Sequence, residues 1–424
     1  MPLTLAKETM EMSWKARAGE QVTQILLEGD MIVPDSKPDL QEILRCEGMV
    51  KIREKRISDD RVSFSGDLEV CVLYRAKNGE KPLYAMKSRL PLEDFLHMDG
   101  LAKGMDVSLE AELEHLDCRI INDRKLSVKA ILSVGAEAEQ KKKAEILTGV
   151  SGETMETLTG ILRMERDVAE VKDRFTVKEE MTIPASLPEI GEILMEHIRL
   201  TEQDIRPMDG KAMVRGNLCI NLLYADEEGN LGSMTEKIPF SGYLENGNIQ
   251  LKTDLTGSLT VEDCRLTPVV DEDGETRALA ADVTIGAVLN GKETAEQTFL
   301  MDAYAPDGVV TLKKEEITYP AAVVNGRNQF TIKERILLEN GEMPMLRAEN
   351  TWGEVRLSEA RTMADAVEAE GVLTADILYH CADDAEPVRM IQRGLPFVQT
   401  MEMKGVLAGD DADVSLRLED MDFQ

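Results

Sequence analysis

The chain of 424 residues lacks the patterns that usually mark an enzyme or a metal site. It contains four histidines, and none has a second ligand two or four residues away. It also has no nucleophile elbow, no Walker loop and no glycine-rich dinucleotide motif. We therefore predict a protein without catalytic residues, cofactor or bound metal. The neighbours His380 and Cys381 offer the one argument for an enzyme, although a Cys-His pair is normally assembled by the fold.

Cysteine is sparse and dispersed. The six cysteines form no C-x-x-C pair, which favours reduced thiols over a disulfide framework or a zinc site. Cys118 and Cys264 lie at matching positions of an internal repeat described below. We expect both to act as small apolar residues on the inner face of a strand.

No apolar run approaches the 18 residues of a membrane span, and the first residues lack the basic start and apolar centre of a signal peptide. We expect a cytosolic protein without membrane insertion. The net charge of -31 repels phosphate backbones and anionic lipids, which excludes nucleic acid as a partner.

The acidic run at residues 271–273 lacks the ligand alternation of a calcium loop, so we interpret it as a hairpin turn.

One segment is written three times, at residues 66–74, 216–224 and 371–379. The copies lie 150 and 155 residues apart, and each begins with glycine and ends with tyrosine. A proline precedes each copy, and another follows each tyrosine after 15 or 17 residues. Such a period predicts tandem domains. The recurring positions form a structural signature, which consists of Pro38, Gly66, Tyr74, Pro91, Pro188, Gly216, Tyr224, Pro239, Pro344, Gly371, Tyr379 and Pro396.

The repeated segment has the period-two alternation of a strand with one buried face, as in Leu68, Val70 and Val72. We expect its other face to be mostly solvated. The glycine falls on the buried side, which indicates a bulge or a close backbone crossing. The later proline indicates an edge strand or a strand end. We interpret the tyrosine as an anchor whose ring caps the core and whose hydroxyl reaches the backbone.

Further elements recur around this segment. Alternating residues before it suggest a strand, with a hairpin partner that turns near residues 18–19, 172–173 and 325–326. A proline and an acid then open a short predicted helix at residues 38–44 and 188–194. Two alternating strands follow in the first two copies, and the third copy lacks the last of them. Residues 144–166 are compatible with either a helix or a strand.

Each repeat thus has six or seven strands and one short helix. The predicted fold is mainly β, with three tandem antiparallel sandwich-like or barrel-like repeats. We place the repeats at residues 1–140, 141–295 and 296–424, the last incomplete at its C-terminal strand.

Short stretches of the first two copies match one known domain family, at residues 32–40, 42–44, 66–68, 72–74, 90–92, 183–184, 187–190, 216–218, 223–224 and 238–240. By these matches, residues 25–134 resemble the SPOCS domain of clostridial spore-coat proteins of the SipL type. The second copy resembles it as well, and the third does so more weakly.

The resemblance implies a scaffold without catalysis, made in the mother cell during sporulation. It would help the coat assemble on the forespore surface by binding stage IV sporulation protein A or another coat protein, and self-assembly is compatible with it. The family typically carries a C-terminal LysM module, which residues 421–424 are too few to form. Two interpretations stay open: a truncated coding region, or a natural protein that continues past Gln424 into a closing strand and that module. A multi-domain binding module for carbohydrate or basic peptide is the alternative, because three similar domains would offer avidity.

Overall fold

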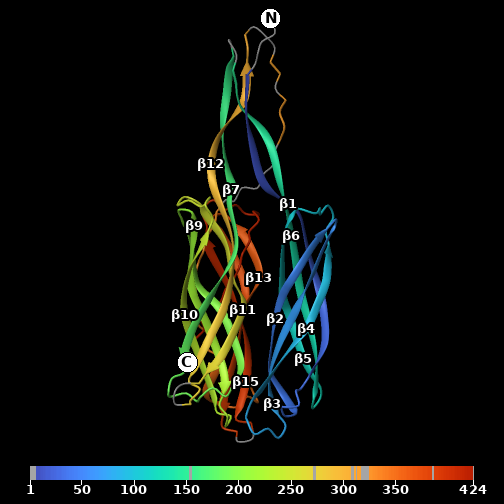
Figure 1. Cartoon of the computed structure of the whole chain (residues 1–424), viewed down its shortest axis with the longest axis vertical. Coiled ribbons are helices and arrows are strands. Elements are labelled where there is room, and N and C mark those ends of the chain that lie inside the picture. The colour runs from blue at the N-terminus through green and yellow to red at the C-terminus, as the bar shows by residue number, and fades with distance from the viewer. Residues whose placement is uncertain are drawn as a thin grey trace.

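The structure is a computed structural model, which describes residues 6–151, 155–270, 274–306, 310–311, 313–316, 324–383 and 386–423. The predicted turn at residues 271–273 lies outside these residues. The described residues form strands and no helix. They fall into three repeats that stand side by side with their strands roughly parallel to the long axis (Figure 1).

The strands are assigned to the repeats in chain order. Repeat 1 contains β1 (Ala6–Ile32), β2 (Leu40–Ser58), β3 (Arg61–Ala76), β4 (Tyr84–His97), β5 (Asp106–Asn122) and β6 (Lys125–Ser151). Repeat 2 contains β7 (Glu156–Thr182), β8 (Glu192–Met208), β9 (Lys211–Ala225), β10 (Leu231–Glu245), β11 (Asp254–Val269) and β12 (Ala278–Tyr304). Repeat 3 contains β13 (Met345–Met363), β14 (Ala366–Cys381) and β15 (Val388–Glu402).

Repeats 1 and 2 are antiparallel sandwiches of two three-stranded sheets. The sheets of repeat 1 have the orders β1-β6-β5 and β2-β3-β4, and those of repeat 2 have the orders β7-β12-β11 and β8-β9-β10. Inward side chains of both sheets form one core in each repeat, as alternation requires. Repeat 3 has the sheet β13-β14-β15, and no second sheet is formed among the described residues. The expected β repeats are therefore present.

The prediction of a short helix in each repeat is wrong. Leu40 and Glu192 begin strands β2 and β8, and a turn precedes each of these strands. Lys37 donates its backbone N–H to the carbonyl of Pro34 in that turn, at 2.9 Å. Seven residues are too few for a helix that is stable by itself, and pairing with β3 or β9 satisfies the same backbone groups while burying the side chains.

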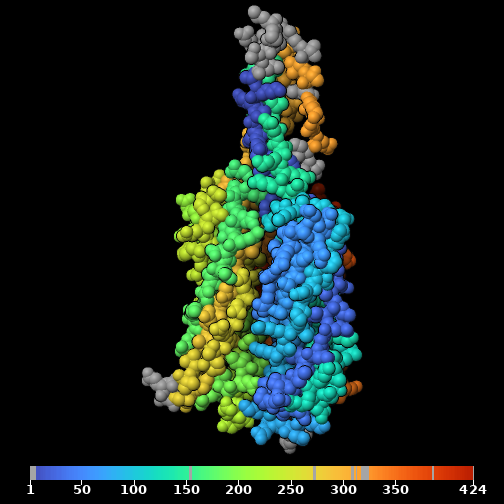
Figure 2. All heavy atoms as spheres, turned by 45° about the vertical axis from the view of Figure 1, so that its right-hand side comes forward, coloured from blue at the N-terminus to red at the C-terminus, as the bar shows by residue number. Residues whose placement is uncertain are grey.

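The expected hairpins before each repeated segment are also absent from repeats 1 and 2. β1 continues through residues 18–19, where the ladder has a register shift, because its first half pairs with the last half of β6. β7 pairs with β12 in the same way. These four long strands rise together above the body of the molecule (Figures 1 and 2). Residues 144–151 and 156–166 are thus strands, and the predicted boundaries at 140/141 and 295/296 fall inside β6 and β12.

The signature glycines lie where two backbones come close. Each lies at a register shift in the neighbouring strand. Gly66 and Gly371 pair directly beside the shift, and Gly216 lies between the pairs on either side of it. A Cβ at Gly216 would lie 2.9 Å from the carbonyl oxygen of Thr201, and a Cβ at Gly371 would lie 2.5 Å from that of Arg356. Glycine is therefore required at these bulges by lack of space.

The later prolines lie on the edge strands. Pro91 is on β4, Pro239 is on β10 and Pro396 is on β15. Each of these strands is at the end of its sheet, so the absent N–H removes no hydrogen bond from a central ladder.

The signature tyrosines lie within two residues of the ends of strands β3, β9 and β14, and their rings are fully buried. The hydroxyl of Tyr74 donates to the carbonyl of Pro38 at 3.1 Å, and that of Tyr224 donates to the carbonyl of Pro188 at 2.9 Å. In repeat 3 the acceptor is the carbonyl of Met343, at 3.2 Å, one residue before Pro344. Burial raises the pKa of Tyr74 and Tyr224 to about 12, so both keep the proton that they donate.

We predict that Gly371→Ala lowers the free energy of unfolding by about 1–3 kcal/mol, because the new methyl group meets the fixed carbonyl of Arg356. Gly394→Ala is the matched control in the same sheet. Its Cβ would lie 3.6 Å from Val372, an ordinary contact, so its effect should stay within about 0.5 kcal/mol. Urea unfolding of both variants measures the difference, and equal effects would contradict the close approach.

Candidate functional site

The outer faces of the three signature strands are buried against one another. Leu73, Leu223 and Leu378 are at equivalent positions of the repeats, directly before the tyrosines, and each has no exposed side-chain surface. They belong to one apolar cluster with residues from all three repeats. The expectation of a mostly solvated outer face is wrong for this end of the strands, because the repeats pack on each other there. We call this contact region the junction.

Polar side chains next to the leucines connect the repeats in pairs. The guanidinium of Arg45 in repeat 1 forms an ion pair with Asp376 in repeat 3. Both side chains are nearly buried, and Gln392 donates a second hydrogen bond to Asp376 at 2.8 Å. The guanidinium also lies over the indole of Trp352, 4.9 Å from the ring centroid. This ion pair joins repeat 1 to repeat 3, and its hydrogen bonds replace those that the charged groups would form with water.

The contact between repeats 3 and 2 uses the equivalent positions with different chemistry. Asn350 is the counterpart of Arg45, and Asn221 is the counterpart of Asp376. The two amides bond to each other reciprocally, at 2.9 and 3.0 Å. Asn221 also donates to the hydroxyl of Thr235 at 2.9 Å.

The contact between repeats 2 and 1 completes the ring. Met195 is the next counterpart of Arg45, and Cys71 is the next counterpart of Asp376. Both belong to the junction cluster, and the thiol of Cys71 lies 3.7 Å from the carbonyl oxygen of Leu194. Burial raises the pKa of Cys71 to about 11, so the thiol remains protonated. The same two surfaces therefore meet three times, head to tail, around a pseudo-threefold axis.

A second polar pair joins repeats 1 and 2. Nδ1 of His197 lies 2.8 Å from a carboxylate oxygen of Glu47. Burial raises the pKa of Glu47, but the hydrogen bond to His197 and the charges of His197 and Arg45 outweigh burial, so the pKa is lowered on balance. The carboxylate is thus held in its charged form at the junction.

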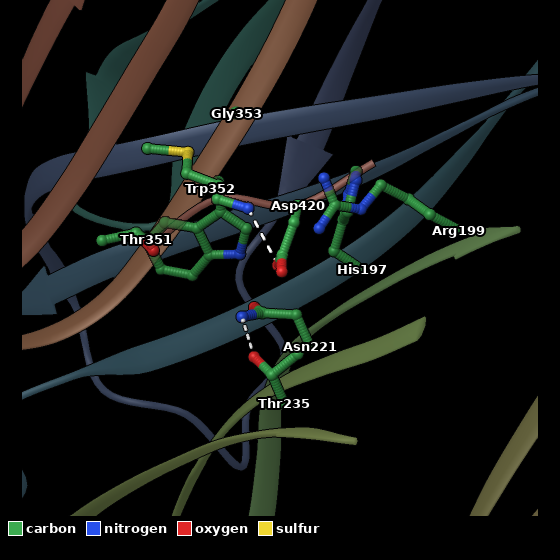
Figure 3. A pocket seen from close by; sticks show the side chains of 9 residues that line it. His197, Arg199, Asn221, Thr235, Thr351, Trp352, Gly353 and Asp420 are labelled. Carbon is green, nitrogen blue, oxygen red and sulfur yellow. Dashed lines mark hydrogen bonds between the residues drawn. The ribbon is translucent and has the colours of Figure 1, made fainter. Parts of the chain in front are cut away.

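The junction contains a cavity of about 20 Å³ between repeats 2 and 3 (Figure 3). Its lining includes His197 and Arg199 of β8, Trp352 of β13 and Asp420 near the end of the chain. The volume suits a single water molecule. A substrate or cofactor does not fit into a space of this size.

A larger hollow of about 430 Å³ lies on the outer face of the sheet β7-β12-β11. Side chains of both charge signs line it, and Lys178 and Asp282 pair there at 2.8 Å. Among the described residues, no group of three or more His, Cys, Asp or Glu side chains could hold a metal ion. The described part of the chain also contains no helix long and apolar enough to cross a membrane.

The residues singled out for possible catalysis do not come together. His380 and Cys381 are neighbours on β14 and so point to opposite faces of the sheet. His380 lies 2.9 Å from Glu349, whereas the thiol of Cys381 is in the core, 3.2 Å from the carbonyl oxygen of Glu386. Neither residue lines either of the two hollows. Cys118 and Cys264 pack against the cores of repeats 1 and 2.

The sequence contained one signal for the junction that alternation alone did not explain. Each repeated segment ends in three consecutive apolar residues, at 72–74, 222–224 and 377–379, directly before a polar turn. The middle residue of each triplet is leucine on the outer face. An apolar outward residue at the same position of three copies indicates contact between the copies.

The comparison with protein families finds a match at three places. The family model described as SipL, SPOCS domain, matches residues 39–121, 189–269 and 346–424, which together make up more than half of the chain. Each match begins at or near the first strand of a β2-β3-β4-type sheet and extends past that sheet. No curated protein and no solved structure matches the chain.

We predict that Arg45→Met lowers the free energy of unfolding by about 3 kcal/mol, because Asp376 is left buried without its cation. The double variant Arg45→Met/Asp376→Asn should regain most of this loss, since it removes the orphaned charge as well. Arg56→Met is the control, because the pair of Arg56 with Glu54 is highly exposed. Chemical denaturation measures the free energy of unfolding of each variant. A double variant no more stable than Arg45→Met would contradict the pairing.

We predict a pH dependence from Glu47. Folding lowers the pKa of this carboxyl, so its stabilising contribution is present above the unfolded pKa of about 4.3 and is lost as the pH falls through the folded value. Glu47→Gln should therefore cost about 1–3 kcal/mol at neutral pH and progressively less in acid. The exposed Glu93→Gln should show no such change. Denaturation at several pH values measures both, and a constant difference for Glu47→Gln would refute the assignment.

Proposed function

The chain belongs to the SipL family of SPOCS-domain proteins, and from this membership we propose that it is a non-catalytic scaffold of the bacterial endospore coat. The family indicates a role in sporulation. The finer proposal is that the protein acts in the mother cell at the forespore surface, where it binds stage IV sporulation protein A or another coat protein. The observation that carries the scaffold proposal is the junction.

The junction supports a scaffold because it joins three domains into one body. Ion pair, amide pair and apolar contacts link all three repeats through buried side chains. A rigid body of this kind holds several outer surfaces at fixed angles, which is useful for assembly. Linkers between independent domains would instead leave those surfaces to move.

The two hollows favour a scaffold over a carbohydrate-binding module. The cavity beside Trp352 has an aromatic wall but a volume of about 20 Å³. The hollow of about 430 Å³ has room for a ligand but no aromatic side chain in its lining. Sugar recognition commonly combines an aromatic face with polar groups in a space of ligand size.

We predict that a fluorescently tagged copy forms a shell around the forespore in sporulating cells, and that the shell is lost in a strain without stage IV sporulation protein A. Arg45→Met should weaken the shell by loosening the junction, whereas Arg56→Met should leave it intact. Fluorescence microscopy during sporulation gives the readout. A diffuse mother-cell signal from the unmodified protein would contradict the proposal.

A further inference from the structure

Repeat 1 contains two cysteines on strands that face each other across its core. Cys46 lies on β2 and Cys118 lies on β5, and these strands are edges of different sheets. Cys46 is paired with Val72 in its own sheet, and Cys118 is paired with Val128. Directly paired residues share a face of a sheet, and both valines are fully buried in the core. The two thiols therefore point inward from opposite sheets.

The two sheets come close together at this edge of the sandwich. Stacked sheets usually lie about 10 Å apart, whereas Cα atoms of β2 and β5 approach within 8 Å of each other. Gly48 of β2 makes this approach possible because it has no side chain. A Cβ there would lie 2.7 Å from Cδ2 of Leu113 and 3.2 Å from Cδ2 of Leu116, both on β5. A disulfide needs Cα atoms about 4.4–6.8 Å apart, which only such a close edge can provide.

Two contacts between the strands enclose the pair of cysteines. The contact at Gly48 is on one side, two residues beyond Cys46. On the other side, Leu40 donates its backbone N–H to the carbonyl of Asp123 at 2.7 Å, so β2 begins where β5 ends. Between these contacts the thiols interact directly, since the interaction with Cys118 is the first cause, and burial the second, that raises the pKa of Cys46.

The equivalent place in repeat 2 holds one thiol. The counterpart of Cys118 is Cys264, whereas the counterpart of Cys46 is Glu196. Burial and the charge of Glu196 raise the pKa of Cys264 to about 12, which agrees with the same two positions lying close together in this repeat. Cys264 is thus a matched cysteine that faces a carboxylate instead of a second thiol.

The pair in repeat 1 is within reach of small molecules. Cys46 and Cys118 are both partly exposed, whereas Cys219 and Cys381 are buried. Cys71 is next to Cys46 in the sheet but on its other face, because its thiol lies at the junction. Both cysteines of the pair are free thiols in the structure.

We propose that Cys46 and Cys118 form a reversible disulfide, which joins the two sheets of repeat 1, when the protein meets a low-molecular-weight disulfide. One thiol loses its proton and attacks the small disulfide, which releases one small thiol and leaves a mixed disulfide on the protein. The second thiol loses its proton and attacks this mixed disulfide, so that the protein disulfide forms and the second small thiol leaves. Two protein thiols are oxidised, and one small disulfide is reduced to two thiols.

This inference rests on the fold of repeat 1 and is independent of the proposed role in the coat. Its failure would leave that role untouched.

Glutathione disulfide is the probe, applied to the folded full chain. The remaining thiols are then alkylated, and a digest made without reduction is mapped by mass spectrometry. We expect one crosslinked peptide pair, which joins Cys46 to Cys118, and no crosslink at the other four of the six cysteines. Dithiothreitol should return all six to free thiols.

Two variants test the identity of the pair. Cys118→Ser should abolish the crosslink and leave Cys46 as a mixed disulfide with glutathione, since the second step lacks its thiol. Cys264→Ser is the matched control, because it removes the equivalent thiol of repeat 2, and it should keep the crosslink. Circular dichroism checks the fold of each variant. The peptide map of the unmodified protein decides by itself where a variant does not fold.

The crosslink should also stabilise the protein. Cys46 and Cys118 are 72 positions apart, and a crosslink that closes a loop of this length restricts the unfolded chain. We expect the midpoint of thermal unfolding to rise by about 5 °C or more on oxidation. Cys264→Ser should show the same rise, and Cys118→Ser should show none.

Several results would overturn the proposal. Separate glutathione adducts on Cys46 and Cys118, or six free thiols after a treatment that oxidises a dithiol peptide, would show that the two thiols do not meet. A crosslink from Cys46 to Cys71 would show that the pair is wrongly assigned. An equal yield of the crosslink in concentrated urea would show that the fold does not direct it.

Discussion

Burial of the outer leucines at the junction is the constraint on which the arrangement of the repeats depends. A three-stranded sheet with one covered face can be stable, but Leu73, Leu223 and Leu378 make the second face apolar as well. That face must be covered, and each repeat covers it with the next one. The head-to-tail contact closes into a ring after three repeats, so the junction surfaces of all three repeats are buried within the same chain.

The chemical differences around the ring assign each repeat its place. Equivalent positions hold an arginine facing an aspartate, an asparagine facing an asparagine, and a methionine in the cluster with a cysteine. An exchange of neighbours would bury Arg45 against an amide or a thiol, and a buried charge without its partner costs several kcal/mol, about 3–5 by comparison with other proteins. The polar contacts therefore specify order, while the leucines contribute apolar burial at equivalent positions of all three repeats.

The sequence predicted the units of the fold better than their assembly. The alternation in residues 66–74 and its copies correctly indicated strands, and three β repeats follow from the period. The helix at residues 38–44 was wrong because local signals of proline and acid were outweighed by pairing with β3. The junction was missed because its contacts join residues of different repeats, 123 positions apart for Cys71 and Leu194 and 150 for Glu47 and His197. In a single sequence, burial on an outer face shows as no more than one extra leucine.

Repeat 3 depends on the junction more than the other two repeats do. Its own core consists of four buried residues, Ile377, Tyr379, Cys381 and Ile391, whereas the cores of repeats 1 and 2 are continuous through two complete sheets. The other face of the same strand contributes Leu378 to the junction, and Asp376 pairs there with Arg45. Strand β14 is thus held firmly on its outer face and weakly on its inner face.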